Sequence, residues 1–272
     1  MKLSVYGATG FVGSKFKYMY PSHLTIKRED RKPLSKDILY LISTVDNYNI
    51  FDQITLDVDS NLKILCEVLQ HCKDKNMTIN YISSWIVYGK TVPIPAIENA
   101  TCFPKGFYSI TKKCAEDLLI SFCQTFNVSY RIIRLCNVLG TGDKGCSRKK
   151  NAITWMINRL REGLDIELYE NGEIIRDFLH VEDACEAIEL ICSQSPKNQI
   201  YNVGGGKPIK IKTIFNLAKN KIKSSSKINS IKSPEFHQLI QPKDFWMDTT
   251  KLNSLGFNQK YNLEEIINSL CC

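Results

Sequence analysis

Three glycines near the start of the chain constrain its fold more than any other feature. Gly7, Gly10 and Gly13 follow directly on a strand-like segment at 2–6, and a helical pattern runs from them to about residue 20. Glycines in such a turn let the backbone approach a pyrophosphate, and the N-terminus of the following helix offers free N–H groups to the anion. The segment therefore predicts a dinucleotide-binding turn.

Strand-like and helical segments alternate along much of the chain. Strands are expected at 24–27, 37–43, 78–82, 128–135 and 199–203, and helices at 59–73, 108–126, 149–161 and 181–192. This alternation predicts an α/β fold, a Rossmann-type doubly wound parallel sheet with helices on both faces. After Gly145 the pattern changes: Asn171-Gly172 predicts a β-hairpin, and the Lys/Ser-rich stretch 219–233 predicts a surface loop.

Composition narrows the function classes. The 272 residues suffice for a substantial core, and the formal charge of +8 attracts anions. The lysines are dispersed without interleaved aromatic residues, so we expect no nucleic-acid partner. No apolar run is long enough to span a membrane and no signal-peptide pattern opens the chain, so we expect a cytoplasmic protein without a membrane partner. The eleven cysteines and four histidines lack short metal-ligand spacings, so we expect no metal site.

A cation stands where the second strand ends. Arg28 falls near the position that usually contacts the adenosine ribose of a bound dinucleotide. A positive charge there suits the 2′-phosphate of NADP, so NADP(H) is the expected cofactor and NAD(H) the alternative. The other interpretation of 27–31 is a solvated run of charges at a strand end.

Three side chains later in the chain can perform acid–base chemistry. Ser84 follows a strand, and Tyr108 and Lys112 lie four residues apart at the start of a helix, hence on one helical face. A neighbouring ammonium favours the phenolate, so we expect the pKa of Tyr108 to fall toward the working pH. The tyrosine could then act as an acid or base on a hydroxyl or ketone, and Ser84 would donate a hydrogen bond to the same oxygen.

The order of these motifs resembles the extended short-chain dehydrogenase/reductases, the NAD-dependent epimerase/dehydratase family, which act on nucleotide-activated sugars. The resemblance covers most of the chain and includes Arg134-x-x-Asn137, Arg176-Asp177-Phe178, Tyr201-Asn202-Val203-Gly204 and Asp248-Thr249-x-Lys251. It implies a dinucleotide-binding domain at 1–145, to which 173–204 returns, and a smaller lobe within 146–272 that binds substrate. It also implies a homodimer.

The resemblance also assigns roles. Ser84, Tyr108 and Lys112 are the expected catalytic residues, and Ser84, Trp85, Asn137 and Arg176 are expected to bind a nucleotide-diphosphate sugar. The expected cofactor-binding residues are Gly7, Thr9, Gly10, Phe11, Val12, Gly13, Arg28, Ser43, Thr44, Tyr108 and Lys112.

The sequence departs from the family pattern at several positions, and these departures narrow the expected fold and reaction. The family fits a helix and a third strand between the positions of Arg28 and Asp37, and so few residues separate them here that the sheet should be narrower at that edge. Members of the family often contact a phosphate through an arginine at the position of the segment 241–244, and this arginine is missing here. Trp85-Ile86 replaces the Asp-Glu pair of the 4,6-dehydratases, which argues against dehydration. Trp85 and Gly142 replace the Cys and His of epimerase-reductases of the GDP-fucose type.

Two reactions stay open for such an enzyme. One is reduction of a 4-keto sugar nucleotide, with Tyr108 as general acid. Arg28 and the narrow sheet edge after it favour an exchangeable NADPH and therefore this reaction. The other is 4-epimerisation with a retained NAD. A non-catalytic NADP-binding sensor or scaffold is the alternative from another class, since fold alone does not fix function.

Overall fold

The structure, a computed structural model, describes residues 2–271. Its elements in chain order are β1 (Leu3–Tyr6), α1 (Phe11–Met19), β2 (Leu24–Thr25), β3 (Asp37–Tyr40), α2 (Asn49–Asp52), α3 (Leu56–Val58), the π-helical turn η1 (Asp59–Lys63), α4 (Ile64–Leu69), β4 (Thr78–Ser84), η2 (Trp85–Tyr88), α5 (Phe107–Phe126), β5 (Ser129–Leu135), β6 (Asn137–Leu139), α6 (Ala152–Arg161), β7 (Ile166–Tyr169), η3 (Glu170–Gly172), β8 (Ile175–Arg176), β9 (Phe178–His180), α7 (Val181–Gln194), β10 (Gln199–Val203), β11 (Ile209–Lys210), α8 (Ile211–Ile222), β12 (Ile228–Ile231), α9 (Glu235–Ile240), α10 (Thr250–Asn253) and α11 (Leu263–Cys271).

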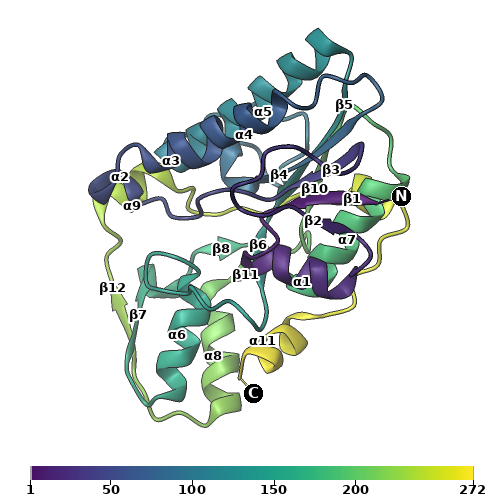
Figure 1. Ribbon diagram of the computed structural model, residues 1–272. Coiled ribbons are helices and arrows are strands. Elements are labelled where there is room, and N and C mark those ends of the chain that lie inside the picture. Colours follow the sequence, from purple (N-terminus) through teal and green to yellow (C-terminus); the bar gives the residue numbers. More distant parts are fainter. Residues whose placement is uncertain (1, 272) are drawn as a thin grey trace.

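A six-stranded parallel sheet forms the centre of the larger part of the molecule. Its strand order is β10-β5-β4-β3-β1-β2, and every neighbouring pair is parallel (Figure 1). The predicted α/β fold with a parallel sheet is therefore confirmed. Within residues 2–271 no strand lies beyond the two-residue β2, so the sheet is narrow at that edge, as the short segment between Arg28 and Asp37 predicted.

Helices cover both faces of this sheet, because its strands are apolar on both sides. On one face α1 and α7 pack over a core that includes Val5, Leu39 and Ile188. On the other face α4 and α5 pack over a second core that includes Ile38, Leu65 and Leu119 (Figure 1). The residues of both cores are buried, and their close packing holds the ends of the strands in place.

A smaller lobe lies beside the carboxyl ends of the strands. Helices α6, α8 and α11 pack on one another around a third apolar core (Figure 1). The predicted hairpin at Asn171-Gly172 is wrong. β7 instead pairs in parallel with β12, and β8 pairs with β11, while Asn171-Gly172 form part of the short turn η3. The predicted loop at 219–233 is wrong too, since it contains the end of α8 and all of β12.

One buried carboxylate ties the smaller lobe to the sheet. Asp177 is fully buried between β8 and β9, and its oxygens accept hydrogen bonds from the backbone N–H groups of Gly205 (2.9 Å), Gly206 (3.3 Å) and Met247 (3.2 Å). Burial raises its pKa to about 6, and these N–H donors limit the rise. The contacts fix the returning chain against the strand end that carries Asn137, whose Nδ2 donates to the Asp177 carbonyl (3.0 Å).

Candidate active site

The residues singled out in the sequence gather at one edge of the sheet. The glycine turn follows β1, Ser43 and Thr44 follow β3, Ser84 ends β4, and Asn137 follows β5. All four strands are parallel, so their carboxyl ends meet along the same edge. Ligands of open parallel sheets bind outside these ends.

The glycine turn fits a pyrophosphate. Gly7 has a φ of +79°, which favours glycine, and a Cβ on Gly13 would lie 2.2 Å from the Gly7 carbonyl oxygen. Gly10 is the N-cap residue of α1 and provides no capping side chain, and the first turn of α1 contains no acidic residue. The N–H groups at this helix end are thus open to an anion.

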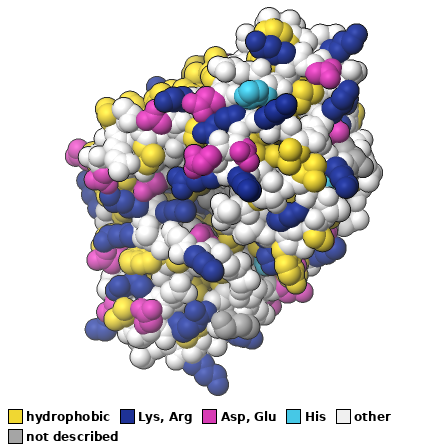
Figure 2. Space-filling model, in the orientation of Figure 1, with side chains coloured by type: hydrophobic (Ala, Val, Ile, Leu, Met, Phe, Trp, Pro, Cys, Tyr) yellow, Lys and Arg dark blue, Asp and Glu magenta, His cyan; other side chains and the backbone are white. Residues whose placement is uncertain are grey.

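A cleft of about 800 Å³ opens between the sheet edge and the smaller lobe (Figure 2). Its lining includes five of the residues predicted from the sequence, namely Ser84, Trp85, Tyr108, Asn137 and Arg176. Side chains that are far apart in the chain therefore share one solvent-filled space. Lys112, the glycine turn and the pair Ser43-Thr44 are outside its lining.

The phenol of Tyr108 is almost fully buried at the sheet end of this cleft. Burial raises its pKa above the ordinary value. The neighbouring hydroxyls of Ser84 and Ser43 act in the opposite direction on this pKa, and the charge of Asp57 adds to the rise. The predicted fall in the pKa of Tyr108 is therefore wrong for this structure, because desolvation outweighs the groups that favour the phenolate.

The position of the Lys112 ammonium explains why this group does not lower the pKa of Tyr108. Its Nζ donates to the carbonyl of Ile82 (2.6 Å) and lies 4.2 Å from the ring centroid of Tyr81. The side chain is almost fully buried, and burial lowers its pKa to about 7, against a smaller opposite effect of Glu116. The helix places Tyr108 and Lys112 together on one face, but in this structure the ammonium contacts strand β4.

Burial of the Lys112 side chain predicts that the stability of the protein depends on pH. Between pH 7 and the ordinary lysine value of 10.5 the unfolded state binds more protons than the folded state, so stability rises with pH. Below that range folding must bury a charge. Lys112→Met should therefore be more stable than the natural chain near pH 6, by on the order of a few kcal/mol, and this advantage should shrink toward pH 10. Urea unfolding at several pH values measures it; an advantage that does not change with pH would contradict the assignment.

A buried polar cluster behind Tyr108 was not predicted. The side chain of Asn61, in η1, accepts from Ser43 Oγ (3.0 Å) and Thr44 N (2.9 Å) and donates to Thr111 Oγ1 (2.9 Å) on α5. Asp57 accepts from Thr44 Oγ1 (2.5 Å) and is itself buried. The cluster ties the end of β3 to the helix that carries Tyr108. Buried polar groups must find partners, but the sequence does not show which ones.

The guanidinium of Arg176 is held by backbone carbonyls. The residue is 6% exposed, and its guanidinium donates to the carbonyls of Lys243 (2.7 Å) and Pro242 (2.9 Å) and lies 5.3 Å from the ring of Trp85. Burial lowers its pKa to about 10. The segment 241–244, which lacks the expected arginine, thus supplies partners for this one. The charge of Asp244 acts against this fall in the pKa, and the Arg176 side chain lines the cleft.

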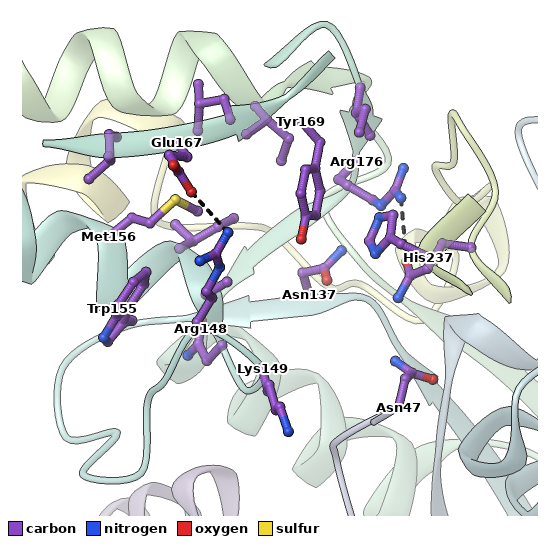
Figure 3. Close-up of a pocket in the computed structure, with 18 of the residues that line it drawn as sticks. Asn47, Asn137, Arg148, Lys149, Trp155, Met156, Glu167, Tyr169, Arg176 and His237 are labelled. Atoms are coloured by element: carbon purple, nitrogen blue, oxygen red, sulfur yellow. Dashed lines mark hydrogen bonds and ion pairs between the residues drawn. The ribbon is translucent and has the colours of Figure 1, made fainter. Parts of the chain in front are cut away.

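The smaller lobe adds cleft residues that the sequence analysis missed. Figure 3 shows Arg148, Lys149, Trp155, Glu167 and Tyr169 around the cleft. Lys and Arg side chains surround the hollow in Figure 2. The run Arg148-Lys149-Lys150 indicates an anion site from the sequence alone. The position of these side chains at the cleft, however, depends on how α6 and β7 pack.

Two aromatic contacts join the lobes over this cleft. Helix α9 lies beside α2 (Figure 1). The ring of Phe236, on α9, packs on Tyr48, which precedes α2, and on Phe51 within α2, with ring centroids 5.3 and 4.8 Å apart. Lys149 pairs with Asp52 of α2 at 3.2 Å. Both lobes therefore contribute walls to the cleft.

Arg28 lies apart from these residues. It is exposed in the turn after β2, and its backbone carbonyl accepts from Arg31 Nη1 (2.8 Å). In the part of the chain that the structure describes, no cluster of His, Cys, Asp or Glu side chains is placed to hold a metal ion. Among residues 2–271, no helix combines the length and apolar character needed to cross a bilayer.

Known proteins resemble this chain in sequence and in fold. Low-salt glycan biosynthesis protein Agl12 of Haloferax volcanii is 25% identical over 68% of this chain and 57% of its own length. GDP-6-deoxy-D-mannose reductase of Pseudomonas aeruginosa is 31% identical over 58% of this chain and 53% of its own length. The chain thus matches little more than half the length of these relatives.

Solved structures share the fold over nearly the whole chain. UDP-glucose 4-epimerase of Thermotoga maritima superposes with a TM-score of 0.88 at 19% identity, covering 99% of this chain and 97% of that one. RMD from Pseudomonas aeruginosa complexed with NADPH gives 0.84 at 20% identity, covering 99% and 97%. The family model of the NAD dependent epimerase/dehydratase family matches residues 38–204, more than half of the sequence. The chain belongs to this family of enzymes.

Proposed function

We propose that this protein reduces a 4-keto sugar nucleotide by hydride transfer, with Tyr108 as general acid. One observation carries the proposal: the phenol of Tyr108 and the side chain of Ser84 line one cleft, which is also lined by Arg148, Lys149 and Arg159. A proton donor at one end and positive charge at the other suit a sugar linked to a diphosphate. The relative named GDP-6-deoxy-D-mannose reductase supports this choice.

The residues of this chain have definable roles in such a step. When bound, a reduced nicotinamide dinucleotide supplies the hydride that reaches the ketone carbon. Tyr108 Oη gives its proton to the ketone oxygen, and Ser84 Oγ donates a hydrogen bond to that oxygen as charge develops on it. A phenol whose pKa is raised is protonated at neutral pH, which suits an acid.

Lys112 takes part in this proposal only after a rotation. Its Nζ must leave the Ile82 carbonyl and turn toward the phenol, which its four-methylene side chain allows. Hydrogen bonds of catalytic groups are often incomplete before ligands bind. There it would stabilise the phenolate left after proton transfer and bind the cofactor, as the resemblance implies.

The binding roles of the remaining residues are part of the same proposal. The glycine turn with Thr9, Phe11 and Val12 would hold the pyrophosphate, and Ser43 and Thr44 would contact the nicotinamide ribose. Trp85 and Asn137 would face the sugar, and Arg176 the diphosphate. We also propose that 1–145 with 173–204 acts as the cofactor domain, and that residues within 146–272 build the substrate lobe.

A direct test combines the purified chain with NADPH and a set of 4-keto sugar nucleotides. Oxidation of NADPH, followed by absorbance, together with a reduced sugar product, is the expected result. The second candidate, a 4-epimerase, is favoured by the fold shared with the UDP-glucose 4-epimerase. Tightly held NAD that copurifies with the protein, and interconversion of 4-epimers without added cofactor, would replace the reductase proposal with this one.

We further propose that NADP(H) is preferred, through Arg28. Its exposed guanidinium can pair with a 2′-phosphate. NADPH should bind more tightly than NADH, and Arg28→Ala should reduce that preference by about tenfold, the loss of one charge-assisted hydrogen bond. Fluorescence titration with both cofactors measures the ratio, with Lys27→Ala as the neighbouring control. Tighter binding of NADH to the natural chain would exclude the idea.

A homodimer is proposed as well. Ile110 and Leu118, two turns apart on α5, are 46% and 40% exposed, and Cys114 lies between them on the same helix face. An apolar helix face of this kind is suited to pairing with a second copy. Light scattering during gel filtration should give twice the mass of one chain, and Leu118→Glu should return the protein to a monomer.

A further inference from the structure

The cleft has two chemically different ends. Figure 3 shows Arg176 and His237 toward one end and Trp155 and Glu167 toward the other, with Tyr169 and Asn137 between them. If the sugar lies beside Tyr108 and its diphosphate contacts Arg176, as the proposed function requires, the base extends toward the second end. The groups at that end therefore meet the base.

An ion pair stands at this second end. Arg148 Nη2 lies 2.9 Å from Glu167 Oε2, and the two side chains are 60% and 47% exposed. Ile166 and Leu168 of β7 are buried in the lobe core, whereas Glu167 between them is exposed and lines the cleft. An ion pair this exposed adds little to stability, and its groups are available to a ligand.

The pair offers a specific set of donors and acceptors. An ionised carboxylate only accepts hydrogen bonds and can accept two in parallel, while a guanidinium only donates. Guanine presents a carbonyl oxygen beside two adjacent N–H donors. Uracil and thymine present one N–H between two carbonyl oxygens, and adenine presents one amino group beside one acceptor nitrogen. Guanine alone matches a carboxylate next to a guanidinium at all three positions.

Flat and apolar surfaces accompany the pair. The indole of Trp155 and the side chain of Met156 line the same end of the cleft (Figure 3), and Arg159 lies 5.2 Å from the Trp155 ring centroid. Aromatic rings and guanidinium planes stack on any base. They provide affinity without selecting one base, so the choice of base depends on the hydrogen-bonding groups of Glu167 and Arg148.

We propose that Glu167 and Arg148 select guanine, so that the substrate is a GDP-linked sugar. In this arrangement both Glu167 oxygens accept from the two N–H donors of the base, and Arg148 donates to its carbonyl oxygen. Uracil or thymine would instead place a carbonyl oxygen against the Glu167 carboxylate. The inference rests on the proposed function, since it requires the nucleotide of the substrate to occupy this cleft.

Nucleoside diphosphates without the sugar provide the test. Calorimetry with the full chain and saturating NADPH should give GDP an affinity at least about tenfold higher than UDP, dTDP or ADP, which is the discrimination expected of one bidentate contact. Glu167→Gln should reduce the affinity for GDP by about tenfold and change that for UDP much less. Both side chains are exposed at the cleft, so the variant should keep its melting temperature.

Glu173→Gln is the matched control. Glu173 is a carboxylate of the same lobe, paired with Lys210 and Lys212 and outside the lining of the cleft, and its replacement should leave all four affinities unchanged. Equal affinities, tighter UDP, or an unaltered preference in Glu167→Gln would overturn the assignment of guanine and leave the proposed function standing. Failure of all four diphosphates to bind would overturn both.

Discussion

Tyr108→Phe should reduce turnover by a factor of about 10²–10⁴ while the affinity for the cofactor stays the same. The variant removes one oxygen, the atom that donates the proton in the proposed step, and keeps the ring that packs against the cleft wall. Ser84 and Ser43 lose a neighbouring hydroxyl, but both keep the hydrogen bonds that they form with other groups. Initial rates of NADPH oxidation and fluorescence titration of NADPH provide the two measurements.

Tyr40→Phe is a suitable control for this variant. Tyr40 is another buried tyrosine of the sheet, and its hydroxyl has no hydrogen-bond partner in the part of the chain that the structure describes. Loss of this oxygen should leave both rate and affinity near those of the natural chain. Near-normal turnover in Tyr108→Phe would remove the phenol from the mechanism and with it the proposed acid.

Arg134→Met should lower the free energy of unfolding by about 3–5 kcal/mol. Arg134 and Glu116 form a bidentate pair, with distances of 3.0 and 2.7 Å, and their side chains are 3% and 1% exposed. Without the guanidinium, the Glu116 carboxylate stays buried with the Ser83 hydroxyl (2.5 Å) as a remaining neutral donor. The penalty is the cost of a buried charge without its counter-ion.

The double variant Arg134→Met with Glu116→Leu separates that penalty from packing. It removes both charges, and replacement of a whole buried pair by apolar groups is often close to neutral, so most of the lost stability should return. Urea unfolding of the three proteins at one pH gives the comparison. A single variant that costs less than about 1 kcal/mol would mean that water reaches Glu116, since exposed pairs contribute only that much. Ser83 precedes Ser84, so this pair also supports the strand end at the candidate site.

Much of the larger part of the molecule could be predicted because its signals are local. The turn at Gly7–Gly13 depends on backbone contacts within one short segment, and continuous apolar runs identify the strands wherever they lie in the sheet. The spacing of Tyr108 and Lys112 places them on one helix face regardless of the surroundings. The short segment between Arg28 and Asp37 allowed a narrow sheet edge to be predicted, since too few residues remain for a helix and a strand.

The predictions were wrong where a strand or a side chain has its contacts in a segment that is distant in the sequence. Asn171-Gly172 has the composition of a tight hairpin, but β7 pairs with β12, about sixty residues later, because Ile228 of β12 packs against the lobe core that buries Ile166 and Leu168 of β7. The pKa of Tyr108 was predicted from its neighbour four residues away. Burial, which only the packed structure reveals, sets its direction.

The sequence by itself determined the family, the parallel sheet and the line of reactive residues at the carboxyl ends of its strands, because short-range spacing and periodicity encode them. Only the tertiary structure decided that the Lys112 ammonium contacts Ile82, that Arg176 is held by the segment 241–244, and that Glu167 and Arg148 line the cleft. These outcomes depend on which groups lose water together when distant segments pack, and no local pattern in the chain records that.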